Sequence, residues 1–128
     1  MSLGYGGFAR LVLKDEKSAL YVYKCENLNR LDNDPKEDGQ IYIELEPIAS
    51  AHVPKKTKRY PEGIPLLFVE NVDFGKMLAD GSLGVENCTN CSLAGDDGVD
   101  VQAWDLIFKI ALEIQRNGTF PETVGYFK

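Results

Sequence analysis

The sequence lacks a long apolar run, and this absence excludes a membrane-spanning helix. Its longest uninterrupted apolar run, Ile64 to Val69, has six residues and contains a proline, whereas about 20 residues are needed to cross a bilayer. The first ten residues show no basic head followed by an apolar stretch, so we expect no secretory signal. Cysteine is also scarce, and three cysteines cannot form a paired disulfide framework. These absences predict a soluble protein of a reducing compartment, with a cytoplasmic location.

Catalytic signatures are equally scarce. His52 is the only histidine, and the chain has neither a Gly-x-Ser-x-Gly nor a His-Glu-x-x-His motif. An enzyme that uses histidine as acid or base would therefore depend on His52 with a carboxylate, and would need a hollow around it. The glycines at positions 4–7 precede a strand instead of entering a helix, so we interpret residues 1–7 as a flexible lead-in and not as a phosphate loop. The sequence favours a non-catalytic domain without deciding the question.

Charge is unevenly distributed along the chain. The protein has 14 Lys and Arg against 20 Asp and Glu, which gives a net charge of −6. Outside one basic run, 10 basic residues stand against 20 acidic ones. A body with this charge repels polyanions and attracts a basic protein partner, so we expect no nucleic-acid partner. The run itself is a candidate anion-binding or partner-binding segment, with an aromatic ring beside it. Its residues are Lys55, Lys56, Lys58, Arg59 and Tyr60.

The length and the apolar patterning predict one domain, residues 1–128, with a sheet of four or five mainly antiparallel strands. Residues 8–13 and 19–25 are β-rich and are joined by a short polar segment, which indicates a hairpin. Residues 40–46 alternate between apolar and polar side chains, as in a half-buried strand. Further expected elements are strands at 66–70 and 123–127 and a short helix at 73–79.

A long helix over residues 101–117 is the clearest expected element. Asp100 is a good N-cap, and Gly118 is suited to end the helix in the left-handed conformation. Apolar residues cover more than half of its circumference, so we expect it to be mostly buried on one face of the sheet, with Trp104 and Phe108 in the core. The predicted fold class is therefore α+β: a single sheet layer with one long C-terminal helix on a face and a short additional helix.

Two segments without periodicity, 26–39 and 47–63, are expected to be solvent-exposed loops. The second contains prolines at positions 47, 54 and 61, which exclude a regular central strand. The leading hypothesis for function is a small intracellular binding or regulatory domain that acts through its acidic surface and these mobile loops, with a protein as partner.

The alternative is a metal or thiol site. Cys88-Thr89-Asn90-Cys91 places two thiols three positions apart, a spacing that can bind one zinc ion or close a small redox disulfide. Cys25 and His52 are the only other soft ligands, and the four would complete a three-cysteine, one-histidine zinc site if the fold brought them together. Structural cysteines, a zinc site and thiol redox chemistry all remain open on the sequence.

Overall fold

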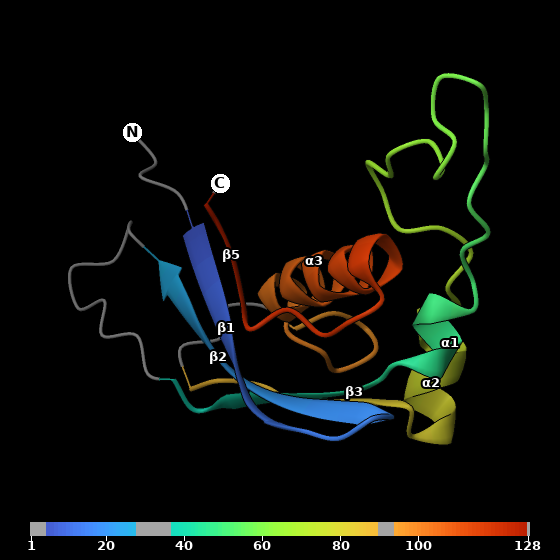
Figure 1. Ribbon diagram of the computed structural model, residues 1–128. Helices are drawn as coiled ribbons and strands as arrows, with labels where there is room; N and C mark the ends of the chain where they lie inside the picture. The colour runs from blue at the N-terminus through green and yellow to red at the C-terminus, as the bar shows by residue number, and fades with distance from the viewer. Residues whose placement is uncertain (1–4, 28–36, 90–93, 128) are drawn as a thin grey trace.

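The protein is an open antiparallel sheet of five strands with a long helix on one face (Figure 1). The computed structural model describes residues 5–27, 37–89 and 94–127. The strand order is β4-β3-β2-β1-β5. The strands are β1 (Tyr5–Lys14), β2 (Ser18–Asn27), β3 (Gly39–Glu44), β4 (Leu83–Glu86) and β5 (Thr123–Phe127). This architecture confirms the predicted α+β class. No helix within the described ranges has the length and apolar character needed to span a bilayer.

Strands β1 to β3 form the predicted meander. The Asp15 carboxyl closes the first turn by accepting hydrogen bonds from the backbone N–H groups of Lys17 and Ser18, at 2.7 and 2.8 Å. β1 begins at Tyr5, so the end of the expected lead-in belongs to the sheet. The predicted loop at 26–39 is bounded by the end of β2 and the start of β3. Its central residues, 28–36, lie outside the described part of the chain.

The long helix α3 (Val101–Asn117) has the predicted bounds. The Asp100 Oδ1 atom accepts a hydrogen bond from the Gln102 backbone N–H at 3.0 Å, and Gly118 ends the helix with a φ of 75°. One face of α3 packs on the sheet through fully buried apolar side chains. They are Ala103, Leu106, Ile107, Ile110 and Ala111.

The prediction that the core includes Phe108 is wrong. Phe108 is 45% exposed, because the apolar surface of α3 is wider than the sheet can cover. Its ring and the half-buried Trp104 ring contact Phe74 of a second helix, with ring centroids 5.2 and 5.8 Å from that ring. This helix, α2 (Phe74–Asp80), is the short helix that the sequence predicts. The outer apolar stripe of α3 therefore forms an aromatic cluster at the surface.

The strand predicted at 66–70 is also wrong, because these residues are in neither strand nor helix. The fourth strand of the meander is instead β4, which pairs with β3 in antiparallel register. Between β3 and α2 the chain forms a single short helical turn, α1 (Glu46–Ala49), and then a projecting segment of residues 52–72, which we call the arm. Figure 1 shows the arm, coloured green to yellow-green, extending away from the sheet and α3.

Candidate functional site

Three potential metal ligands from distant parts of the sequence meet beneath the first turn of α3. Cys25 lies near the end of β2, Cys88 follows β4, and Asp100 is the N-cap of α3. The two sulfur atoms and one carboxyl oxygen lie within 4.8 Å of one another. Cys25 Sγ is 3.3 Å and Cys88 Sγ is 3.8 Å from Asp100 Oδ2. Cys25 and Asp100 are 0% exposed and Cys88 is 3% exposed, so the group is closed off from solvent. We call these three residues the thiol–carboxyl cluster.

Neighbouring polar groups hold the cluster in position. The Tyr23 hydroxyl donates to Asp100 Oδ2 at 3.1 Å and accepts a hydrogen bond from the Cys88 backbone N–H at 3.0 Å. The Asn87 side chain accepts from the Asp100 backbone N–H at 2.8 Å and donates to the Gly98 carbonyl at 2.9 Å. These hydrogen bonds therefore join β2, the segment after β4 and the N-cap of α3 to one another. Such support fixes side-chain orientation before any ligand arrives.

The two thiols differ in acidity. The Cys25 thiol donates a hydrogen bond to Cys88, and this bond, together with burial, raises the pKa of Cys25. The same hydrogen bond lowers the pKa of Cys88, because it stabilises the Cys88 thiolate. The first turn of α3 lies beside both sulfurs, and the positive end of a helix favours a thiolate. Cys88 is thus the more acidic of the two thiols.

The structure brings together two of the four residues that the sequence proposed as soft ligands. Cys91 lies outside the described residues. His52 lies at the opposite end of α3, where its Nδ1 is 3.2 Å from Glu70 Oε2 and the Glu70 backbone N–H donates to Gln115. From Asp100 to Gln115 the helix rises about 22 Å, at 1.5 Å per residue. His52 is therefore too distant to share an ion with the thiol–carboxyl cluster.

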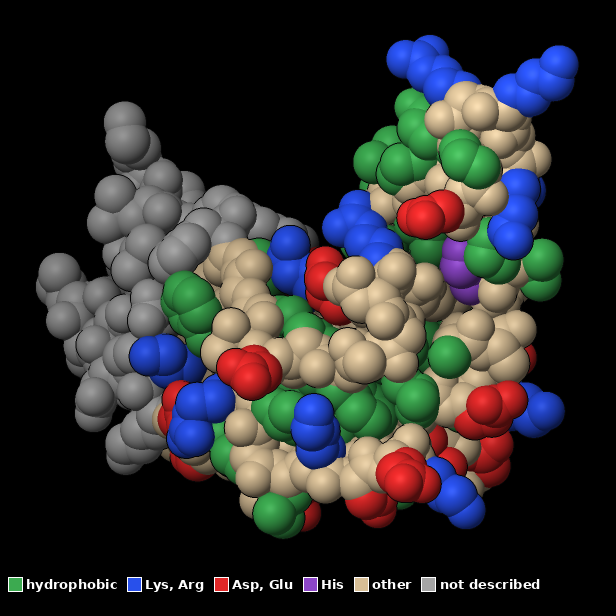
Figure 2. Space-filling view, viewed as in Figure 1, with side chains coloured by type: hydrophobic (Ala, Val, Ile, Leu, Met, Phe, Trp, Pro, Cys, Tyr) green, Lys and Arg blue, Asp and Glu red, His purple; other side chains and the backbone are tan. Residues whose placement is uncertain are grey.

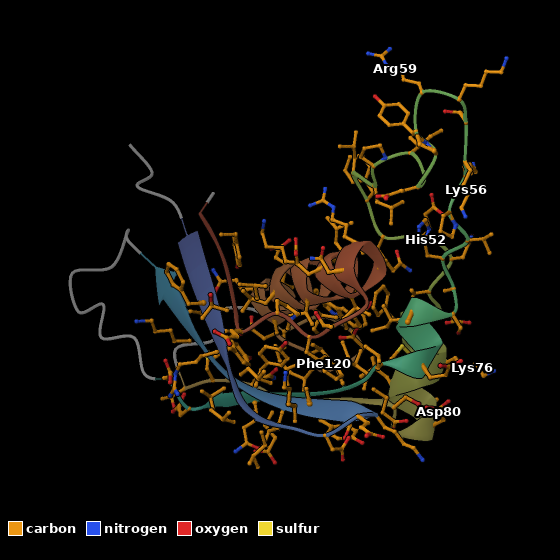
Figure 3. All side chains as sticks on the ribbon, in the orientation of Figure 1. His52, Lys56, Arg59, Lys76, Asp80 and Phe120 are labelled. Atoms are coloured by element: carbon orange, nitrogen blue, oxygen red, sulfur yellow. The ribbon has the colours of Figure 1, made fainter. Side chains whose placement is uncertain are left out.

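The His52–Glu70 pair is one of several contacts that hold the base of the arm against the body. We call this base, formed by His52 and residues 66–70, the neck. The buried Gln115 side chain donates to the carbonyls of Ile48 and Glu70, at 3.1 and 2.8 Å, and accepts from the Glu70 N–H at 2.9 Å. The Arg116 guanidinium donates to the Leu66 carbonyl, with its Nε at 2.8 Å. The Gln115 and Arg116 side chains thereby engage four backbone groups, namely the carbonyls of Ile48, Leu66 and Glu70 and the Glu70 N–H. Figure 3 shows the arm projecting from the body above this anchored base.

The outer part of the arm is folded by its own backbone. The Ile64 N–H donates to the Lys55 carbonyl at 2.9 Å, and the Gly63 and Thr57 N–H groups both donate to the Tyr60 carbonyl, at 3.0 and 3.1 Å. Gly63 has a φ of 119°, a conformation that a residue with a Cβ rarely adopts. The arm thus has a defined tip, even though it contains no helix or strand.

Cationic and apolar side chains are exposed together on the arm. Lys55, Lys56, Lys58 and Arg59 are all exposed, and Figure 2 shows lysine and arginine side chains at the tip with hydrophobic side chains next to them. Figure 3 shows Arg59 at the tip, pointing away from the body, and Lys56 partway along the arm. The exposed large apolar side chains of the arm are Val53 (74% exposed), Ile64 (44%), Leu67 (72%) and Phe68 (80%).

Two hollows adjoin His52, as the enzyme hypothesis requires. One, of about 350 Å³, lies between His52 and the strip from Ile64 to Glu70, and the other, of about 400 Å³, lies between the arm and the end of α3. Apart from His52, Glu62 and Glu70 supply the acid–base groups, together with Lys55 and Arg116. The described residues that line these hollows include no serine, threonine or cysteine to act as nucleophile. The His52–Glu70 contact also joins the two ends of the arm, since His52 begins it and Glu70 lies near its end.

Sequence reasoning missed two members of the buried site. It identified Asp100 only as a helix cap, and it gave Tyr23 no role. The alternation of β2 was the available signal, because it places Tyr23 and Cys25 on one face of the strand, and the N-cap of the helix packed on that face lies close to the end of β2. Comparison of the chain with protein-family models, with curated proteins and with solved structures gives no match.

Proposed function

We propose that this protein is a non-catalytic binding domain whose arm docks against an acidic protein partner. The observation that carries the proposal is the combination on one anchored projection of four exposed cations and four exposed large apolar side chains. Exposed apolar residues grouped beside charge are typical of interaction surfaces. Phe68, at 80% exposed, is the natural central contact.

Charge separates the arm from the rest of the molecule. Residues 52–72 contain four Lys and Arg against two Glu, so the arm has a net charge of +2 within a chain of −6, and the remainder carries −8. A partner that meets the tip must complement those cations, which favours an acidic surface over the basic partner expected from net charge alone. The acidic remainder opposes binding to a neighbouring polyanion, and this favours a compact acidic patch on a protein over nucleic acid.

The apolar part of the arm also argues for a protein. Phosphate contacts need cations, but they leave no use for exposed leucine and phenylalanine side chains beside them. Arg59 lies over the Tyr60 ring, 5.7 Å from its centroid, and so covers one side of the aromatic ring that could stack on a base. Anchoring by Gln115 and Arg116 reduces the entropy lost when the arm is bound, because the neck is ordered beforehand.

Quantitative co-purification from native lysate tests this proposal with two arm variants. One variant replaces the four cations at 55, 56, 58 and 59 with glutamate, and the other carries Leu67→Ser and Phe68→Ser. A matched control replaces four exposed lysines of the body with glutamate, which produces the same change in net charge. These lysines are Lys14, Lys17, Lys76 and Lys109.

We expect a protein that the wild type and the body control retain at moderate salt and that both arm variants lose. Binding should weaken by at least about tenfold for Phe68→Ser alone, as for a central contact residue worth more than 1.4 kcal/mol. Equal retention by the arm variants would show that the arm is not the contact. Loss of the partner after nuclease treatment, or no partner at low and moderate salt, would also contradict the proposal.

A further inference from the structure

The thiol–carboxyl cluster has the dimensions of a tetrahedral zinc site. With Zn–S bonds of about 2.3 Å and Zn–O bonds of about 2.0 Å at tetrahedral angles, a sulfur and an oxygen ligand of one ion are about 3.5 Å apart. The two measured separations between sulfur and Asp100 Oδ2, 3.3 and 3.8 Å, bracket that value. All three ligand atoms fall within 4.8 Å of one another, so one ion can reach all of them with small side-chain adjustments.

The surroundings of the cluster also suit a bound cation. Asp100 uses Oδ1 to cap α3 and presents Oδ2 to both sulfurs, so metal binding does not compete with the helix cap. The Tyr23 hydroxyl bonds both Asp100 Oδ2 and the Cys88 backbone, the kind of outer contact that orients metal ligands. Two thiolates and a carboxylate buried together would repel one another strongly, and a divalent cation removes that cost.

We propose that Cys25, Cys88 and Asp100 bind one zinc ion, with the fourth position taken by water or a further donor. Soft thiolate ligands select zinc over the hard cations Mg²⁺ and Ca²⁺. The ion joins the end of β2, the segment after β4 and the first turn of α3. Binding displaces the thiol protons to solvent, so affinity rises with pH. The inference does not depend on the function proposed for the arm.

Metal analysis of the full chain, purified without chelator, gives the first test. We expect close to one zinc per chain, and after removal of the metal we expect added Co²⁺ to produce the charge-transfer absorption of thiolate-bound cobalt. Cys25→Ser, Cys88→Ser and Asp100→Asn should each lower the affinity for zinc by at least about a hundredfold, more than loss of an outer-shell contact. Asparagine retains the ability to cap α3, which protects folding in the Asp100 variant.

Two control variants sharpen the result. Asp97→Asn removes a nearby exposed carboxyl that bonds the Val99 N–H and the Trp104 indole, and it should leave zinc binding unchanged. His52→Ala removes the remaining soft ligand proposed from the sequence, and it should also leave zinc binding unchanged. Circular dichroism of each apo variant confirms that it is folded before its affinity is measured.

Less than about a tenth of an equivalent of zinc, together with no cobalt–thiolate band, would overturn the proposal. Loss of zinc in His52→Ala with retention in Cys25→Ser would also overturn it, because the site would then lie elsewhere. Rapid formation of a Cys25–Cys88 disulfide by diamide, in protein that takes up no zinc, would identify the pair as a redox dithiol instead.

Discussion

Replacement of Gln115 with leucine should loosen the attachment of the arm to the body. The substitution keeps the approximate volume of the side chain but removes three hydrogen bonds, two donated to the Ile48 and Glu70 carbonyls and one accepted from the Glu70 N–H. A buried group that loses its partner costs about 1–3 kcal/mol. Ile48 is buried, whereas Glu70 is half-buried and can regain water contacts. We therefore expect Gln115→Leu to lower the free energy of unfolding by about 2–4 kcal/mol.

Gln102 provides a matched control at the other end of α3. Its exposed fraction is 9%, against 8% for Gln115, and within the described ranges its side chain makes no hydrogen bond to another element. Gln102→Leu should therefore cost less than about 1 kcal/mol. Urea unfolding measures both variants, and amide hydrogen exchange should show lost protection at Glu70 only in Gln115→Leu. Equal destabilisation by the two substitutions, or unchanged exchange at Glu70, would refute the idea that Gln115 fastens the neck.

Two further predictions concern tyrosines of the core. Burial raises the pKa of Tyr21 above its usual 10.0, so this tyrosine ionises first in the unfolded chain, and the free energy of unfolding falls as the pH rises above 10.0. Phenylalanine at position 21 cannot ionise. Between pH 8 and 11, the free energy of unfolding measured in urea should therefore fall by about 1.4 kcal/mol less for Tyr21→Phe than for the wild type. A Cβ added at Gly39 would overlap the Tyr23 ring, so Gly39→Ala should lower the free energy of unfolding by about 1–3 kcal/mol, as measured by thermal unfolding. Gly84→Ala is the control, because its Cβ would meet only Tyr42 Cβ, at 3.9 Å, and it should change that free energy by less than about 0.5 kcal/mol.

The elements that the sequence predicts correctly are those specified by local signals. Helix α3 has a cap residue at each end, and both its bounds follow from Asp100 and Gly118. β3 is short, but its alternation places Ile41 and Ile43 on the buried face as expected. β4 has only four residues, one of them Gly84, and it is a strand because β3 offers an edge to pair with. No local pattern reveals such an element.

The misassigned apolar segments have a common cause. The strip at 66–70 has strand-like composition, but Pro65 precedes it and the Gln115 and Arg116 side chains take up its backbone groups, so it has no sheet to join. Phe108 continues the apolar pattern of α3, but its ring contacts Phe74 of α2 and remains 45% exposed. Composition indicates that a side chain is apolar, and it does not indicate whether the fold has a surface to cover it.

The candidate site shows the same limit more sharply. Cys25 and Cys88 are 63 positions apart, and only the pairing of β3 between β2 and β4 brings them to one end of the sheet. The local spacing of Cys88 and Cys91 pointed to the segment that carries Cys88, but Cys91 lies outside the described residues and the pairing of these two thiols stays a prediction. Nothing in the sequence was a reason to consider Asp100 as a metal ligand, because its role as a helix cap already accounts for an aspartate at that position.

Helix α3 connects the two proposed sites and also keeps them independent. Its N-cap belongs to the thiol–carboxyl cluster, and Gln115 near its other end fastens the arm. Between them, Leu106, Ile107 and Ile110 are fully buried against the sheet, and close packing of this kind resists gradual deformation. A signal from zinc to the arm would need an element with two stable positions, and this structure shows α3 in one. The proposed zinc ion would therefore stabilise the fold on which the arm is mounted, whereas the proposed partner would depend on the surface of the arm.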